Sequence, residues 1–229
     1  MTATLNIGFL LFDDITQLDF TGPLQVLSRV PGAKVHLVAR TLDPVRTVCG
    51  PFILPDTTIA ACPDLDLICI PGGVGVDAAM QDDEIVDFVR RQGAQARYVT
   101  SVCTGAFILG AAGLLAGRQA TTHWRYHALL AAFGAEPVKA RVVRDGNLFT
   151  GGGVTAGIDF AFTVVVELAG ETVAQAIQLG LEYDPHPPVD CGSPDKACVH
   201  VRGAVEQRFA PRVEAFEGLL REMRAAETV

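Results

Sequence analysis

The stretch YVTSVCTGAFILGAAGLL, residues 98–115, decides the fold. Residues 98–102 read as a strand buried on both faces of a sheet, and residues 104–115 read as a buried helix of small and apolar side chains. Only Cys103 stands between the two elements. A strand that passes directly into a helix is the building unit of parallel α/β sheets. The stretch therefore predicts an α/β protein with Cys103 at the carboxyl end of a buried strand.

The rest of the chain repeats this alternation of short apolar runs and helical patterns. Strands are predicted over residues 5–12, 35–39, 45–49, 52–54 and 65–70, with a hairpin around Asp145-Gly146-Asn147. Helices are predicted over residues 82–92, 124–133, 155–168 and 172–181. One more helix is expected to open at Thr21-Gly22-Pro23, because proline is favoured in a first turn. The pattern predicts a mostly parallel sheet with helices on both faces.

The chain of 229 residues has the length of one domain. A proline-rich stretch over residues 184–197 is the one candidate boundary, and the residues after it are too few for a second domain. We therefore predict a single α/β domain over residues 1–195. Residues 196–229 are predicted to be a C-terminal helical arm of the same domain, interrupted at Pro211 and suited to pack on a neighbouring subunit.

Composition excludes several classes of protein. The formal net charge of −8 disfavours a nucleic-acid partner. The N-terminus lacks the basic start and cleavage site of a signal peptide, and no apolar run suits a membrane helix. The six cysteines are scattered without a C-x-x-C pair, which argues against a zinc site and a thioredoxin-like centre. These observations predict a cytoplasmic protein with reduced thiols.

Three features fall at or just beyond the carboxyl ends of predicted strands, where open parallel sheets bind ligands. They are Asp19, Pro71-Gly72-Gly73 and Cys103. The turn around Cys103 resembles the elbow that exposes the serine of G-x-S-x-G hydrolases, and the amides of the following helix favour a thiolate there. Cysteines in apolar proteins are more often packed core residues, and Asp19 on its own reads equally well as a helix N-cap or first-turn acid. The elbow favours a nucleophile at Cys103.

Six segments together resemble one enzyme family, and they span residues 5–195. They are IGFLLF…QLDFTGPLQVL, ICIPGG, RYVTSVCTGAFILGAAGLLAG, ATTHW, RVVRDGNLFTGGGVTAGIDFA and LEYDP. The sequence is similar to the isocyanide hydratases of the ThiJ/PfpI superfamily. The resemblance implies a flavodoxin-like sheet, a homodimer, and addition of water to a small isocyanide to give an N-substituted formamide. It implies no cofactor and no metal.

The resemblance also implies the roles of four residues. Cys103 is expected to attack the isocyanide and form a thioimidate, and Asp19 is expected to act as the general acid and base. A carboxylate beside a thiol raises both pKa values unless the two share a proton, so the pair is expected to titrate as a unit. The backbone amides of Gly73 and Thr104 are expected to stabilise negative charge.

Three alternatives belong to the same superfamily. Its proteases carry His directly after the cysteine, where this chain has Thr104, so peptidase activity is disfavoured. Glyoxalases and deglycases generally pair the cysteine with Glu, so Asp19 argues against them without excluding them. A ligand-sensing or redox-sensing domain related to AraC-type regulators stays open, although residues 196–229 are too short for a helix-turn-helix module.

Other polar residues near these motifs are left without a firm role. His123 and His127 have helical metal-pair spacing, but no nearby acid or cysteine completes a site, so His123 is expected in the core or beside Cys103. Tyr183 and Asp184 either border the pocket or serve the fold. Gly151-Gly152-Gly153 is interpreted as a close backbone approach to the site, and oxidation of Cys103 remains possible.

Overall fold

The computed structural model describes residues 4–226 and is built on a seven-stranded sheet of order β10-β11-β7-β6-β1-β2-β5. Every neighbouring pair is parallel except β10 and β11, which form the predicted hairpin. This confirms the predicted mostly parallel sheet. The strands are β1 (Leu5–Leu10), β2 (Ala33–Ala39), β5 (Thr57–Thr58), β6 (Leu67–Ile70), β7 (Tyr98–Val102), β10 (Val142–Asp145) and β11 (Leu148–Gly151).

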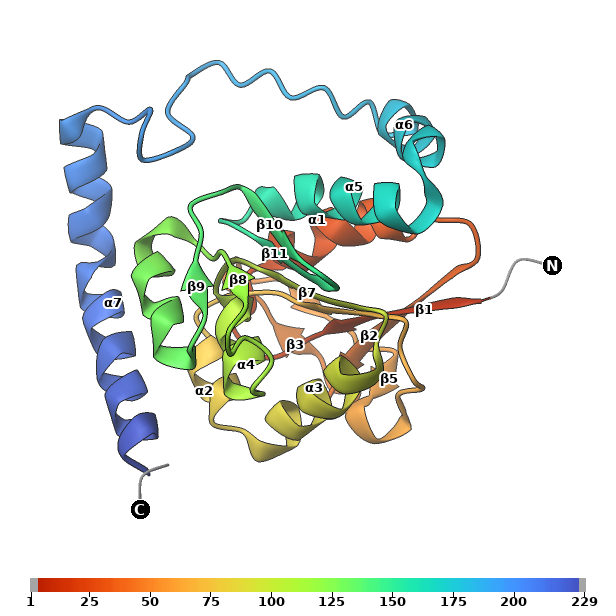
Figure 1. Cartoon of the computed structure of the whole chain (residues 1–229), viewed down its shortest axis with the longest axis horizontal. Helices are drawn as coiled ribbons and strands as arrows, with labels where there is room; N and C mark the ends of the chain where they lie inside the picture. The colour runs from red at the N-terminus through yellow and green to blue at the C-terminus, as the bar shows by residue number, and fades with distance from the viewer. Residues whose placement is uncertain (1–3, 227–229) are drawn as a thin grey trace.

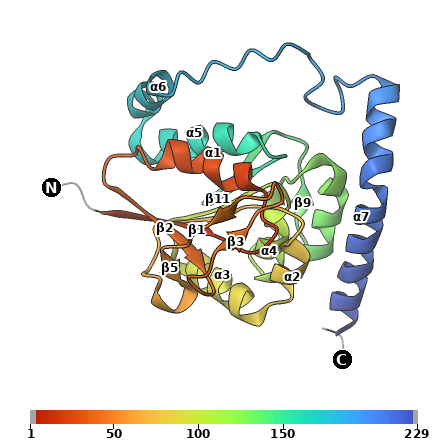
Figure 2. The ribbon, with the colours of Figure 1, turned by 180° about the vertical axis from the view of Figure 1, so that it is seen from behind.

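Helices cover both faces of the sheet, as Figure 1 and the reverse view in Figure 2 show. Helices α1 (Gln17–Leu27) and α5 (Ala156–Ala169) lie on one face, and α2 (Val76–Met80), α3 (Asp83–Gln95) and α4 (Ala106–Ala111) on the other. The remaining elements are α6 (Glu171–Gly180), α7 (Val199–Ala226), the 3-10 helices η1 (Ile59–Ala61), η2 (Cys103–Gly105) and η3 (Trp124–Phe133), and the strand pairs β3 (Val45–Arg46) with β4 (Phe52–Ile53) and β8 (Gln119–Ala120) with β9 (Glu136–Pro137). No helix within residues 4–226 combines the length and apolarity needed to cross a membrane.

The centre of the sheet fixes where the site lies. All residues of β6 and β7 are buried, as expected for parallel strands covered on both faces. The two strands pair in parallel, with Ile70 opposite Ser101, so both end at the same edge of the sheet. The loop that begins at Pro71 and the elbow at Cys103 are thereby brought together. This is the edge at which ligands bind in open α/β sheets.

Helix α1 begins at Gln17, so the prediction that it opens at Thr21-Gly22-Pro23 is wrong. Pro23 lies inside the helix, where its missing N–H leaves the carbonyl of Asp19 without the usual helical donor. The earlier start places Asp19 in the first turn and fully buried. Close packing of α1 against α5 offsets the missing hydrogen bond. A Cβ at Gly157 of α5 would stand only 3.1 Å from Pro23 Cδ, so the two helices approach closely at this point.

Helix α7 runs without interruption through Pro211, so the predicted break there is wrong. The residues that come after the proline hold the helix to the body of the protein, since Val213, Phe216 and Leu220 are buried in the core. Figure 1 shows α7 along one side of the molecule, where it packs against η3. The helix predicted over 104–115 is also shorter, because Gly113 takes a left-handed conformation with a φ of 78°.

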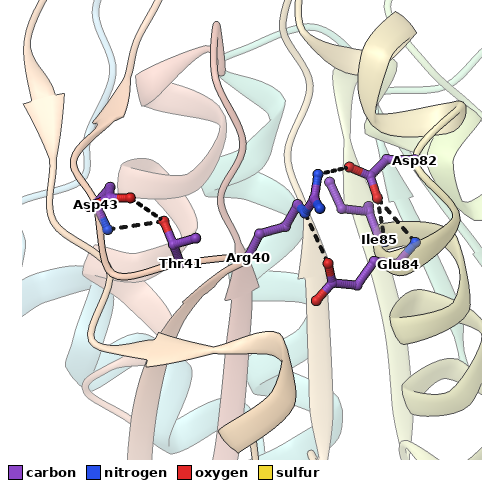
Figure 3. A network of polar contacts seen from close by, with 6 residues as sticks. All are labelled: Arg40, Thr41, Asp43, Asp82, Glu84 and Ile85. Atoms are coloured by element: carbon purple, nitrogen blue, oxygen red, sulfur yellow. Dashed lines mark hydrogen bonds and ion pairs between the residues drawn. The ribbon is translucent and has the colours of Figure 1, made fainter.

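A polar network fastens the loop after β2 to the start of α3 (Figure 3). Arg40 pairs with Asp82 at 2.7 Å and with Glu84 at 3.0 Å. Asp82 is the N-cap of α3 and accepts from the backbone N–H groups of Glu84 and Ile85. The loop lines a cavity of about 340 Å³ beside the carboxyl ends of β1 and β2.

Candidate active site

Cys103 occupies a strained elbow directly after β7. Its φ is 55°, a left-handed conformation that is unfavourable for any residue other than glycine. Two hydrogen bonds hold this backbone in place: the Cys103 N–H donates to the Gly152 carbonyl at 2.9 Å, and the Thr122 hydroxyl donates to the Cys103 carbonyl at 2.6 Å. The structure thus confirms that the cysteine lies at a strand-to-helix junction.

Gly105 lets the elbow approach the end of β6. A Cβ at this position would stand 2.1 Å from the Ile70 carbonyl oxygen and 2.6 Å from that of Pro71. No side chain fits there, because both neighbours are backbone atoms. The glycine therefore sets the distance between the Cys103 elbow and the loop over residues 71–73.

Asp19 reaches the elbow from the first turn of α1. The Gly72 N–H donates to its Oδ2 at 2.9 Å, and the carboxyl lies close enough to Cys103 to interact with its thiol. Oδ1 is buried and has no hydrogen-bond partner within residues 4–226. Burial raises the pKa of Asp19 to about 7, against the opposing effects of its interactions with Gly72 and Cys103. The carboxyl therefore holds a proton at higher pH than an exposed aspartate does.

The sulfur of Cys103 is surrounded by donors. The backbone N–H groups of Thr104 and Val154 and the Thr104 side chain all interact with it, and each lowers its pKa. Burial, followed by the negative charge of Asp19, outweighs them and raises the pKa of the thiol. The amides thus lower the pKa of the thiol, as expected, but the net pKa is raised. Both groups therefore resist ionisation, and once the pair has lost one proton, the two groups share the proton that remains.

The two predicted anion-stabilising amides have different partners. The Thr104 N–H faces Cys103 Sγ. The Gly73 N–H donates to Thr104 Oγ1 at 3.1 Å, and Gly73 itself has a φ of 144°. The role of these two amides stays a prediction.

Val154 and Thr122 are site residues that the sequence reasoning did not select. The Val154 N–H reaches the sulfur because Gly151-Gly152-Gly153 brings the backbone close to the elbow before α5 begins. The run of three glycines was the available signal. Thr122 had no comparable signal, because its hydrogen bond to Cys103 links positions nineteen residues apart.

His123 lies close to this backbone, whereas the other uncertain residues lie elsewhere. A Cβ at Gly153 would stand 2.8 Å from His123 Cδ2, and burial lowers the pKa of His123 to about 4. No cluster of metal-binding side chains occurs in the part of the chain that the structure describes. Tyr183 donates to Asp159 Oδ1 of α5 at 2.7 Å, and Asp184 is exposed.

The parallel sheet and its buried elbow cysteine define a known class of α/β protein. The chain belongs to the DJ-1/PfpI family, whose model matches residues 6–167. It is 58% identical to the isonitrile hydratase of Pseudomonas putida over 92% of this chain and 92% of that protein.

Structural and more distant relatives agree with this assignment. A ThiJ/PfpI family protein from Pseudomonas syringae superposes with a TM-score of 0.93 at 44% identity, covering 96% of this chain and 91% of that one. Drosophila melanogaster DJ-1beta superposes with a TM-score of 0.72 at 26% identity, covering 80% and 100%. A transcriptional regulator of Pseudomonas aeruginosa, GbdR, is 29% identical over 78% of this chain but only 51% of its own length. The match therefore spans about half the length of GbdR.

Proposed function

We propose that the protein is an isocyanide hydratase, which adds water to a small isocyanide to give an N-substituted formamide. The observation that carries the proposal is the buried pair of Cys103 and Asp19 in a chain 58% identical to an isonitrile hydratase. An isocyanide carbon accepts a soft sulfur nucleophile and then needs a proton on the same carbon. A thiol beside a carboxyl supplies both the nucleophile and the proton.

The reaction begins with Cys103 and Asp19 holding one proton between them. The sulfur lone pair forms a bond to the terminal carbon of R–N≡C while Asp19 delivers its proton to that carbon, giving the thioimidate R–N=CH–S. The Asp19 carboxylate then removes a proton from a water molecule as the water oxygen bonds to the carbon. The proton that remains on the added oxygen passes to the nitrogen as the C=O bond forms, and breaking of the C–S bond returns its electron pair to sulfur and releases the formamide R–NH–CHO. The scheme uses no cofactor.

The surroundings of the pair suit this chemistry. Oδ2 of Asp19 is occupied by the Gly72 N–H, so Oδ1 is the oxygen left to carry the transferable proton. The Thr104 and Val154 amides stabilise the sulfur when it is negative, at the start of the cycle and again when the product leaves. We assign Cys103 and Asp19 as the catalytic residues on this basis.

We also propose that the protein works as a homodimer in the cytoplasm, where Cys103 stays reduced. Exposed apolar side chains gather on segments next to the site. The Val48 N–H donates to the Ile15 carbonyl, and Ile15 forms a β-bridge with Gly73. Phe52, in β4, is 63% exposed, and Leu54, just after β4, is 68% exposed. Such a surface suits a second copy of the chain. Sedimentation of Phe52→Lys and Leu54→Lys should give monomers, and a dimer in both would place the interface elsewhere.

We further propose that residues 196–229 form an arm of the same domain as residues 1–195. The support is Phe216 of α7, which is 1% exposed and packs with its ring centroid 4.7 Å from that of Phe107 in α4. A helix that supplies a core residue unfolds with that core. Thermal unfolding should therefore show one transition by both circular dichroism and Trp124 fluorescence, and two transitions would overturn the assignment.

The function is tested by incubating the protein with an aryl or alkyl isocyanide and following the formamide. Wild type should turn over, Cys103→Ala should be inactive, and Cys49→Ala, which changes an exposed thiol, should match wild type. Inactive wild type or an active Cys103→Ala variant would overturn the proposal. Turnover of methylglyoxal in place of isocyanide would indicate a glyoxalase-type enzyme of the same superfamily.

A further inference from the structure

Arg212 of α7 forms its bonds with another part of the chain. Its guanidinium pairs through two nitrogens with both carboxylate oxygens of Asp77, in α2, and donates to the Val74 carbonyl oxygen at 2.8 Å. The two side chains are partly buried, with 29% of Arg212 and 26% of Asp77 exposed. A forked guanidinium pair of this kind fixes the positions of its partners. Arg212 therefore ties α7 to residues 74–77.

Aromatic contacts on either side of Arg212 hold α7 firmly at this point. Phe209 stacks on His123, with ring centroids 5.3 Å apart. Phe216 is 1% exposed, and its ring centroid lies 4.7 Å from that of Phe107 in α4. Residues 209, 212 and 216 are spaced to share one face of a helix, the face that α7 turns toward η3 and α4 (Figure 1). Arg212 thus extends from a fixed base.

The loop that Arg212 holds leads directly to the catalytic pair. Residues 71–75 connect β6 to α2, and the Gly72 N–H donates to Asp19 Oδ2 at 2.9 Å. A Cβ at Gly72 would stand 2.7 Å from the Thr104 nitrogen and 2.9 Å from Asp19 Oδ2, so this backbone lies against both residues. Val74, whose carbonyl Arg212 binds, is only two residues further along. A shift of the loop would therefore move the amide that holds the carboxyl.

We propose that Arg212 is a positioning residue for Asp19. By holding Val74 and Asp77, it keeps the Gly72 N–H on Oδ2 and leaves Oδ1 as the oxygen that carries the transferable proton. Arg212 acts through the loop and takes no part in bond making. The inference rests on the proposed hydratase function.

The place of Arg212 in the chain gives the C-terminal arm a part in the reaction. The family model matches residues 6–167, which include both Asp19 and Cys103. Helix α7 begins at Val199, beyond that range. The catalytic pair therefore belongs to the part of the chain that the family shares, whereas the arm supplies the residue that holds the loop against it.

Loss of this tie should raise the pKa of Asp19, because the Gly72 hydrogen bond lowers that pKa against the effect of burial. Arg212→Met and Asp77→Asn both break the tie, but the first removes a positive charge and the second a negative one. A direct effect of charge would shift the pKa of Asp19 upward in the first variant and downward in the second. An upward shift in both variants therefore identifies movement of the loop.

Alkylation of Cys103 by iodoacetamide reports on the pair without an isocyanide. The rate is followed from pH 5 to pH 9 by mass spectrometry of the peptide that contains Cys103, which separates this thiol from the other cysteines. In Arg212→Met and Asp77→Asn, the pH of the half-maximal rate should rise by about 0.5 relative to wild type. With an aryl isocyanide at pH 6, kcat/KM should fall about threefold, because the fraction of the pair that has lost one proton falls by that factor.

Arg202→Met is the matched control. It removes an exposed ion pair with Glu206 on the same helix and should keep the wild-type midpoint. Melting temperatures check that each variant is folded at the assay temperature. If Arg212→Met is not folded, Asp77→Asn decides alone, because its change of charge by itself would lower the midpoint.

An unchanged midpoint in both variants, or shifts in opposite directions, would overturn the inference and leave the hydratase function standing. If wild type does not turn over isocyanides, the proposed function fails. The alkylation profiles would still show whether Arg212 positions Asp19.

Discussion

The thiol of Cys103 interacts with the carboxyl of Asp19 at a place where both residues are buried, with exposed fractions of 7% and 0%. Asp19 comes from the first turn of α1, and Cys103 comes directly after the central strand β7. Burial raises the pKa of both groups, so above a pH of about 7 the pair holds a single proton. This one relationship determines how the stability and the activity of the protein should respond to pH.

Stability should decrease as the pH rises through neutrality. The pKa of Asp19 is raised from 3.8 to about 7, so the folded state binds this proton more tightly than the unfolded state does. The resulting stabilisation is fully present below pH 4 and is lost as the pH rises through 7. Between pH 5 and pH 8 the loss should be about 3 kcal/mol. Urea unfolding of wild type and Asp19→Asn measures it, and an equal pH dependence in the two proteins would contradict the assignment.

Catalysis should increase over the same pH range. Attack requires a pair that has lost one of its two protons, and that loss occurs with the pKa of Asp19, at about 7. The value of kcat/KM for an isocyanide should therefore rise about tenfold per pH unit below 7 and level off above it. The substrate does not titrate in this range. A profile that is flat from pH 5 to pH 8 would show that the Asp19 proton does not limit the reaction.

Gly105→Ala should unfold or severely destabilise the protein. The added methyl group would stand 2.1 Å from the Ile70 carbonyl oxygen, and the elbow would have to move away from β6. We expect a loss of about 3 kcal/mol in the free energy of unfolding. Gly180→Ala is the matched control, because a Cβ there meets no atom within 4 Å. Equal melting temperatures for the two variants would show that the close approach is not required.

Arg212→Met should weaken the attachment of α7. The variant keeps most of the side-chain volume but leaves Asp77, which is 26% exposed, without its partner. We expect a loss of about 2 kcal/mol. Arg202→Met on the same helix removes only an exposed pair with Glu206 and should change stability by less than about 0.5 kcal/mol. Thermal unfolding of both variants decides the matter, and an unaltered Arg212→Met would mean that the apolar residues alone hold α7.

The central part of the fold was predictable because its physical signals are local. Strand β7 was predicted with its observed bounds, since a short run that contains three β-branched residues leads directly into the Cys103-Thr104-Gly105 turn. The start of α1 was not predictable in this way. Proline favours a first turn, but Phe20 and the residues around it are buried only if the helix begins earlier at Gln17. Tertiary packing decided that boundary.

The site shows the same division. Cys103 was found from its own neighbours in the sequence, because the elbow is a local feature. Asp19 was assigned through resemblance, since its function depends on a carboxyl meeting a thiol eighty-four positions away. The position of Val154 depends on how the segment before α5 approaches the elbow in the folded chain, and the residues next to Val154 in the sequence do not carry that information.

The central claim is that Cys103 adds to an isocyanide and that Asp19 protonates the carbon. Rapid mixing of wild type with a stoichiometric isocyanide, followed by acid quench and peptide mass spectrometry, tests it directly. The account predicts a transient adduct with the full mass of the isocyanide on the peptide that contains Cys103, decaying at the rate at which formamide appears. In deuterated water, the formamide carbon should carry one deuterium. Formamide that appears without an adduct on Cys103, or without deuterium on carbon, would contradict the account.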